Sequence, residues 1–182
     1  MIVSFFREIF SWIKAIAIAL IIVFVVREFL VTPSIVKGES MMPSLQDGDR
    51  IIISKLTSID RFDEIAFQSP DRDEKYVKRV IGVAGDSIKM ENDILYINGI
   101  AYDEPYLEKF KQSLSGEQSL TDDFDLEALT GETIVPDGKL FVLGDNRLVS
   151  RDSRAFGLIT EESVIGDVVF RIWPLDQFGI PE

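Results

Sequence analysis

The chain has 182 residues with neither cysteine nor histidine, and its formal charge is −12. The missing residue types exclude disulfides, cysteine nucleophiles, Cys/His zinc sites and Ser-His-Asp triads. Residues 32–182 carry −13 and residues 1–31 carry +1, and such an acidic body argues against binding of nucleic-acid phosphates.

The N-terminal segment is strongly apolar. Residues 15–26 are all Ala, Ile, Leu or Val except for one Phe, which leaves no polar face for a helix on a soluble domain. Extension back to Ile9 gives 18 residues with a single charge, Lys14. At 1.5 Å per residue these cover about 27 Å, close to the thickness of a bilayer core. We predict one membrane-spanning helix over about 9–28.

Two other interpretations of this segment are a cleaved signal peptide and a buried core helix. In a cleavable signal peptide, small residues stand after the apolar run, at positions −3 and −1 before the cleavage point. Here the charged, proline-containing sequence REFLVTPSIVK follows the apolar run. Positive charge lies slightly on the N-terminal side of the helix. This favours a single-pass protein of the cell membrane, with a cytoplasmic N-terminus and an extracytoplasmic domain.

From Ser34 onward the pattern becomes that of a β domain. Short runs rich in Ile, Val, Phe and Tyr, such as DRIIISKL, EIAFQS, ILYINGIAY and DVVFRIWPL, alternate with Gly, Asp, Asn and Pro. This pattern predicts a mainly β, antiparallel fold. Asn92-Asp93 and Asn98-Gly99 stand between apolar runs and predict hairpin turns.

Residues 103–135 are polar and acidic and have little strand signal, so we predict an insertion or an extended flap. The DDFDLE sequence within them lacks the glycine that a calcium-binding loop needs at its sixth position. We therefore expect a solvated turn there, and neither a metal nor another cofactor in the protein.

The segment KGESMMPSL places Ser40 on a bend close to Gly38. A serine is a weak nucleophile until a base removes its proton, and the usual base, histidine, is absent. A lysine is basic enough, but with an ordinary pKa of about 10.4 it must be held neutral by burial among apolar groups. The sequence must therefore supply a lysine within an apolar strand.

The segment EKYVKRVIGVAGD supplies such a lysine. In a strand Tyr76, Lys78 and Val80 share one face and Arg79 points the other way. Two alternatives stay open at this point: a buried Arg79 with a solvated Lys78, or two surface charges on an edge strand.

The segment GDNRLVSRDSR, residues 144–154, is unusually polar for a sequence beside the apolar run KLFVL. This density suggests a buried hydrogen-bonded network, in which a serine hydroxyl could orient a neutral lysine and an Asp–Arg pair could fix the loop. The alternative is a surface turn with ion pairs, which contribute little to stability.

Taken together, these blocks resemble the type I signal peptidases, or leader peptidases, which are membrane-anchored Ser/Lys proteases. GESMMPSL is similar to the family's S-M-x-P-T-L, YVKRVIGVAGD to its K-R-x-x-G-x-x-G-D, and GDNRLVSRDSR to its G-D-N-x-x-x-S-x-D-S-R. The likeness covers most of residues 10–175 and is weakest at 103–135. It implies a coiled-sheet catalytic domain from 32–90 and 136–182, a smaller inserted lobe from 91–135, and an N-terminal anchor from 1–31.

The resemblance also implies roles for matching residues. Ser40 would be the nucleophile, Lys78 the general base, and Ser150 would orient Lys78 through a hydrogen bond. Asp152 and Arg154 would stabilise the surrounding network, and Asp145 and Asn146 would shape the same turn.

Two departures from the family pattern concern Ser44 and Gly38. Ser44 replaces the usual threonine and keeps the hydroxyl. Gly38 stands where some members have a hydroxyl residue that contributes to the oxyanion hole. We therefore expect that hole to use backbone N–H groups at Ser40 and Gly38.

The implied substrates are exported preproteins, cut after small residues at −3 and −1, and the implied second partner is the lipid bilayer. Our candidates for the substrate pocket flank the catalytic pair, and each of them could equally be a core residue: Val36, Met41, Leu45, Tyr76 and Val77.

Two other functions remain open. One is a self-cleaving Ser/Lys protein of the LexA type, although an apolar helix stands here where those repressors carry a DNA-binding domain. The other is a catalytically inactive, membrane-anchored binding or assembly module, which the presence of Ser40, Lys78 and Ser150 argues against.

Overall fold

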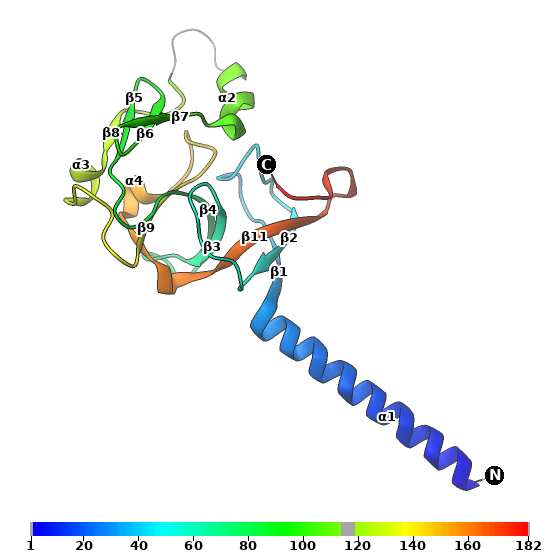
Figure 1. Cartoon of the computed structure of the whole chain (residues 1–182). Coiled ribbons are helices and arrows are strands. Elements are labelled where there is room, and N and C mark those ends of the chain that lie inside the picture. The colour runs from blue at the N-terminus through cyan, green and yellow to red at the C-terminus, as the bar shows by residue number, and fades with distance from the viewer. Residues whose placement is uncertain (1, 114–118, 182) are drawn as a thin grey trace.

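The computed structural model describes residues 2–113 and 119–181. Helix α1 (Ile2–Val25) continues through a π-helical turn, η1 (Val26–Leu30), directly into strand β1 (Val31–Ile35). The helix projects away from the rest of the molecule (Figure 1). The stretch from Arg7 to Leu30 is long and apolar enough to cross a membrane, and none of it is buried in the structure. The predicted helix over 9–28 is therefore the central part of a longer helical segment.

Seven strands form a large curled sheet in the order β1-β2-β11-β3-β4-β9-β10. The strands after β1 are β2 (Arg50–Ser54), β3 (Glu64–Gln68), β4 (Lys75–Gly82), β9 (Lys139–Leu143), β10 (Ile159–Thr160) and β11 (Val164–Trp173). Every neighbouring pair is antiparallel. Register shifts in β11 and between β4 and β9 mark irregularities, and such bulges bend a sheet. The mainly β, antiparallel prediction is confirmed.

A smaller sheet has the order β7-β6-β5-β8. It contains β5 (Ile88–Glu91), β6 (Ile94–Ile97), β7 (Ile100–Tyr102) and β8 (Phe124–Asp125). Asn92 and Asp93 have φ of 52° and 62°, and Asn98 and Gly99 have φ of 55° and 75°. Left-handed backbone at both central positions is what the tight turn of a hairpin needs, so both hairpin predictions are confirmed.

The segment predicted as a flap has more structure than expected. It contains η2 (Pro105–Leu107), α2 (Glu108–Ser113), β8 and α3 (Leu126–Thr130), while residues 114–118 lie outside the described part. Its leucines at 107, 120 and 126 are buried, and Leu126 packs in the core with residues of β4, β5 and β9. Its acidic residues act both locally and at a distance: the Asp125 carboxylate caps α3 by accepting from the amide of Ala128 at 2.7 Å, and Glu104 forms a buried ion pair with Arg147. The division of the chain into domains stays a prediction.

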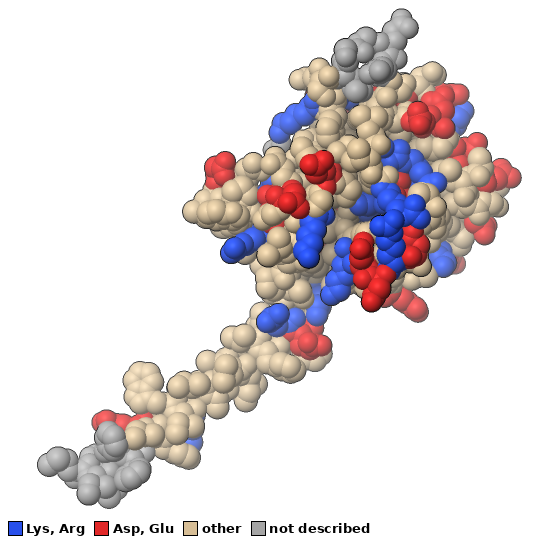
Figure 2. Space-filling model, turned by 180° about the vertical axis from the view of Figure 1, so that it is seen from behind, with Lys and Arg blue, Asp and Glu red and all other residues tan. Residues whose placement is uncertain are grey.

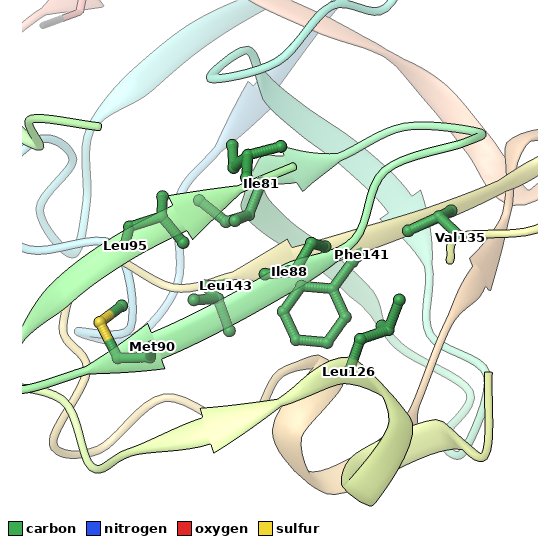
Figure 3. Close-up of a cluster of buried hydrophobic side chains, with 9 residues drawn as sticks. Ile81, Ile88, Met90, Leu95, Leu126, Val135, Phe141 and Leu143 are labelled. Carbon is green, nitrogen blue, oxygen red and sulfur yellow. The ribbon is translucent and has the colours of Figure 1, made fainter. Parts of the chain in front are cut away.

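An apolar core joins the two sheets. Figure 3 shows residues of β4, β5, β9 and α3 converging on one another, with Phe141 of β9 facing Leu126 of α3. Gly82 allows the close approach, because a Cβ there would lie 2.3 Å from Cδ1 of Ile88. The core therefore fixes the end of β9, and the polar segment 144–154 begins directly after it. The remaining short helices are α4 (Ser153–Phe156), η3 (Glu161–Ser163) and η4 (Leu175–Gln177).

Candidate active site

The structure brings Ser40 and Lys78 into contact. Ser40 lies in the turn that follows β1, and Lys78 lies in the middle of β4. Nζ of Lys78 donates to Oγ of Ser40 at 2.6 Å, across 38 residues of sequence, and to the carbonyl of Val77 at 3.1 Å. Folding thus places a nitrogen base within hydrogen-bonding distance of the candidate nucleophile, as catalysis by such a pair requires.

The surroundings of Lys78 favour its neutral form. Lys78 as a whole is only 3% exposed. Burial lowers the pKa of Lys78 to about 8, against the opposing effect of the negative charges of Asp152 and Asp145. Removing an ammonium group from water disfavours its charged form, so close to neutral pH a useful fraction of this lysine is unprotonated. The arrangement with a solvated Lys78 is not the one found.

Arg79 is buried too, on the opposite face of β4. Nε and Nη2 donate to the carboxylate of Asp145 at 2.9 and 2.7 Å, and Nη2 also donates to Glu64 at 2.7 Å. The hydroxyl of Ser44 donates to the same Asp145 carboxylate at 2.5 Å. This ionic cluster connects the strand of Lys78 with the turn of Ser40 and with the loop after β9.

The charged groups in this cluster shift one another's pKa values. Burial lowers the pKa of Arg79, but the hydrogen bond and charge of Asp145 outweigh it, so the net shift is upward. Burial raises the pKa of Glu64 to about 7, against the attraction of Arg79. Sequence reasoning missed Glu64 as a site residue. Its signal is the register of β3 and β4, which sets Glu64 opposite Arg79.

The loop after β9 holds the nucleophile turn in place. The amide of Asn146 donates to the carbonyl of Ser40 at 3.0 Å, and its side-chain Nδ2 donates to the carbonyl of Glu39 at 3.1 Å. Asp152 accepts from the amide of Gly144 at 3.0 Å and pairs with Nε of Arg154 at 2.8 Å. The structure therefore brings together the four residues predicted to support the site: Asp145, Asn146, Asp152 and Arg154.

Ser150 does not make the predicted hydrogen bond to Lys78. Its Oγ is buried and has no hydrogen-bond partner within residues 2–113 and 119–181. It lies close to Gly144, because a Cβ built there would be 2.1 Å from Oγ of Ser150 and 2.5 Å from the carbonyl oxygen of Ser40. In this structure the second hydrogen bond of Lys78 goes to Val77. The orienting role of Ser150 stays a prediction.

The two amides expected in the oxyanion hole differ in availability. The amide of Gly38 donates to Oδ1 of Asp47 at 2.7 Å, so in this conformation it is already used. The amide of Ser40 makes no hydrogen bond to any described residue and is free to stabilise a developing negative charge. A hole with both donors needs Asp47 to release Gly38.

A groove of about 1000 Å³ runs past Ser40 and Lys78. Four of the five predicted pocket residues line it, namely Val36, Met41, Tyr76 and Val77. The prediction for Leu45 is wrong: it is 0% exposed and packs in the core beneath the groove. Sequence reasoning missed further apolar lining residues on neighbouring strands, Ile35, Ile53, Ala66 and Ile165.

Comparison with known proteins gives consistent matches. The family model "Signal peptidase, peptidase S26" matches residues 9–173. The chain is 44% identical over 180 residues to signal peptidase IB of Staphylococcus aureus (strain COL), which covers 94% of this chain and 93% of that protein. It is 49% identical over 166 residues to signal peptidase I of Bacillus caldolyticus, with coverage of 89% and 90%.

A solved structure matches as well. The crystal structure of a signal peptidase I from Enterococcus faecalis V583 aligns with a TM-score of 0.61 at 42% sequence identity, over 63% of this chain and 99% of that chain. The family match extends from the apolar helix to the end of β11, so it contains every residue of the candidate site.

Proposed function

The chain belongs to the signal peptidase family, peptidase S26, and on that premise we propose that it removes N-terminal signal peptides from exported preproteins with Ser40 as nucleophile and Lys78 as general base. The contact of 2.6 Å between Oγ of Ser40 and Nζ of a buried Lys78 carries this assignment. It supplies both parts of an activated serine in a chain without histidine.

The geometry supports a two-step acyl transfer. Neutral Lys78 accepts the hydroxyl proton of Ser40 while Oγ attacks the carbonyl carbon of the scissile bond. The amide of Ser40 stabilises the negative charge that develops on the carbonyl oxygen. Protonated Lys78 then gives its proton to the departing amine. In the second step Lys78 removes a proton from the water that hydrolyses the acyl-enzyme, and the serine is restored.

The groove supports binding of an extended peptide. Among the described residues, positions 75–78 of β4 pair with β3 on one side only, because β9 pairs β4 from Arg79 onward. Within the same part of the chain, strand β1 pairs only with β2. Two free strand edges thus flank the groove, and an extended chain binds such edges through backbone hydrogen bonds. Apolar walls that include Val36 and Val77 suit the small residues next to the cleaved bond.

The topology that we propose follows from the anchor. The described chain has one apolar helix at its N-terminal end, and Arg7 and Lys14 precede its most apolar part. Positive charge on that side favours a cytoplasmic N-terminus. A single pass then places the β domain on the extracytoplasmic side of the cell membrane, where exported preproteins emerge.

The test is cleavage of a purified preprotein in detergent by the full chain. We expect the wild type to release the signal peptide and Ser40→Ala to release none, while its circular dichroism and melting temperature stay close to those of the wild type. Near-normal cleavage by a folded Ser40→Ala protein would remove Ser40 from the mechanism. No cleavage by the wild type would favour the inactive module, and cleavage only of its own chain would favour a self-cleaving protein.

A further inference from the structure

One residue of the catalytic body, Lys55, donates hydrogen bonds to several backbone carbonyls at the end of the anchor helix. The last carbonyls of a helix have no partners within it. The amide of Lys55 donates to the carbonyl of Leu30 at 2.9 Å. Its Nζ donates to the carbonyl of Glu28 at 2.6 Å and to that of Arg27 at 3.5 Å. Lys55 therefore contacts three of the five carbonyls in η1.

Lys55 gives the anchor a second attachment to the body. The first is covalent, because η1 ends at Leu30 and β1 starts at Val31 without a linker. Lys55 directly follows β2, which pairs with β1 over the full register from Val31 opposite Ser54 to Ile35 opposite Arg50. A positive charge at a helix C-terminus also interacts favourably with the helix dipole. Two attachments on neighbouring strands restrict the angle between helix and sheet, which a single chain connection cannot do.

The residues around Lys55 are typical of a membrane interface. Phe29 is 62% exposed and Leu56 is 69% exposed, one from the end of the helix and one from the chain after β2. Charged residues of both signs gather where the helix meets the body, whereas much of the helix carries none (Figure 2). Apolar side chains next to charged ones mark the level at which a helix leaves the bilayer. Lys55 thus lies at this level.

Strand β1 and the short non-regular segment 36–39 separate this level from the nucleophile. The five residues of β1 rise about 16 Å at about 3.3 Å each, and Ser40 follows in a turn bound to the loop after β9 through Asn146. The height of Ser40 above the bilayer is therefore set by the angle between the helix and β1. A preprotein is held in the same bilayer by its signal segment. The height of its cleavage point above the bilayer is set by the length of chain between its apolar segment and that point.

We propose that Lys55 is a positioning residue that fixes the height of Ser40 above the membrane, and so selects which bond of a membrane-held preprotein is cut. This inference rests on the proposed function. A soluble peptide carries no membrane constraint, so its cleavage does not depend on Lys55. A membrane-held preprotein is cut well only when the distance between its apolar segment and its cleavage point matches that height.

The experiment uses full-length protein in liposomes, with a soluble peptide and a series of preproteins. In the series the segment between the apolar region and the cleavage point is lengthened residue by residue. For Lys55→Met we expect unchanged peptide cleavage, a fall of about two- to fivefold on the best preprotein, and a flatter dependence on segment length. Lys55→Arg keeps a cation and a donor, so it should resemble the wild type.

Lys109→Met is the matched control. Lys109 is an exposed lysine of α2 without a hydrogen bond or ion pair to any described residue, and this change should alter neither substrate. If Lys55→Met shows the wild-type length dependence, the positioning role is wrong. The role is equally wrong if Lys55→Met slows peptide and preprotein by the same factor, because Lys55 then acts on the body itself. If the wild type cuts neither substrate, the proposed function fails instead.

Discussion

The catalytic proposal depends at the residue scale on the protonation of Lys78. Because burial lowers the pKa of Lys78 to about 8, the rate of peptide cleavage should rise with pH through about 8 and then level off. Lys78→Arg should be as inactive as Lys78→Ala, since a guanidinium stays protonated and cannot accept the serine proton. The measurement is a rate-versus-pH profile of the three proteins. Substantial activity of Lys78→Arg at neutral pH would place the base elsewhere.

The same burial makes Lys78 a cost to stability. Its pKa is about 8 in the folded state against 10.5 for a free side chain. Between these values the unfolded chain binds more protons, so stability should rise with pH across this window. Below pH 8 the whole penalty remains, and Lys78→Met should raise the free energy of unfolding by up to about 3 kcal/mol. Urea unfolding at pH 7 and at pH 10 tests this. An equal gain at both pH values would contradict the linkage to protonation.

At the scale of structural elements, the turn that carries Ser40 and the loop after β9 pack against each other at Gly144. A Cβ there would lie 2.1 Å from Oγ of Ser150 and 2.5 Å from the carbonyl oxygen of Ser40. Backbone cannot yield as a side-chain tip can, so Gly144→Ala should displace the nucleophile. A shift of about 1 Å at a reacting group can cost about 100-fold in rate. We expect a loss of that order in kcat, which peptide cleavage by the purified variant measures.

Gly131→Ala is the control for this prediction. Gly131 has a φ of 80° at the end of α3, with no atom within 4 Å of an added Cβ. This change should lower the unfolding free energy by about 1–2 kcal/mol, because a Cβ disfavours left-handed backbone, and leave kcat unchanged. Equal kcat values for the Gly144→Ala and Gly131→Ala proteins would mean that the close contact at Gly144 does not position Ser40.

Elements with local signals could be predicted from the sequence, whereas contacts between elements could not. Asn98-Gly99 predicted its turn because a left-handed backbone favours these two residue types. The family blocks predicted that Ser40 and Lys78 belong together, but not that Glu64 faces Arg79, which depends on the β3–β4 register. Leu45 follows the nucleophile closely and yet is buried, because the turn folds back onto the core.

The groove shows the same limit. Ile53, Ala66 and Ile165 line it from three different strands. Each of them is an ordinary apolar residue of its strand, and only the strand order β2-β11-β3 makes them neighbours. Residues brought together by sheet topology leave no mark in the local sequence.

The arrangement of the whole molecule predicts that the catalytic body cleaves peptides and that the anchor serves to hold the enzyme at the membrane. The body holds the contact between Ser40 and Lys78 and the free strand edges of the groove. Helix α1 projects away from the body (Figure 1), and none of its described residues lines the groove. Removal of residues 1–30 leaves β1 intact. The truncated protein should therefore cleave a soluble peptide at close to the rate of the full chain.

Membrane-held substrates should separate the two forms. The anchor confines the enzyme to the surface that holds the preprotein, and such tethering raises the effective concentration of one partner for the other by about 100-fold or more. We expect a loss of that order when the truncated form acts on a preprotein in liposomes, measured as initial rates at equal enzyme concentration. When enzyme and preprotein are both dissolved in detergent, the truncated form should cleave at close to the rate of the full chain, because in detergent the two partners no longer share one membrane surface. An equal rate for both forms in liposomes would show that the body finds the membrane without its helix, in which case exposed side chains such as Leu56 and Trp173 would have to hold it there.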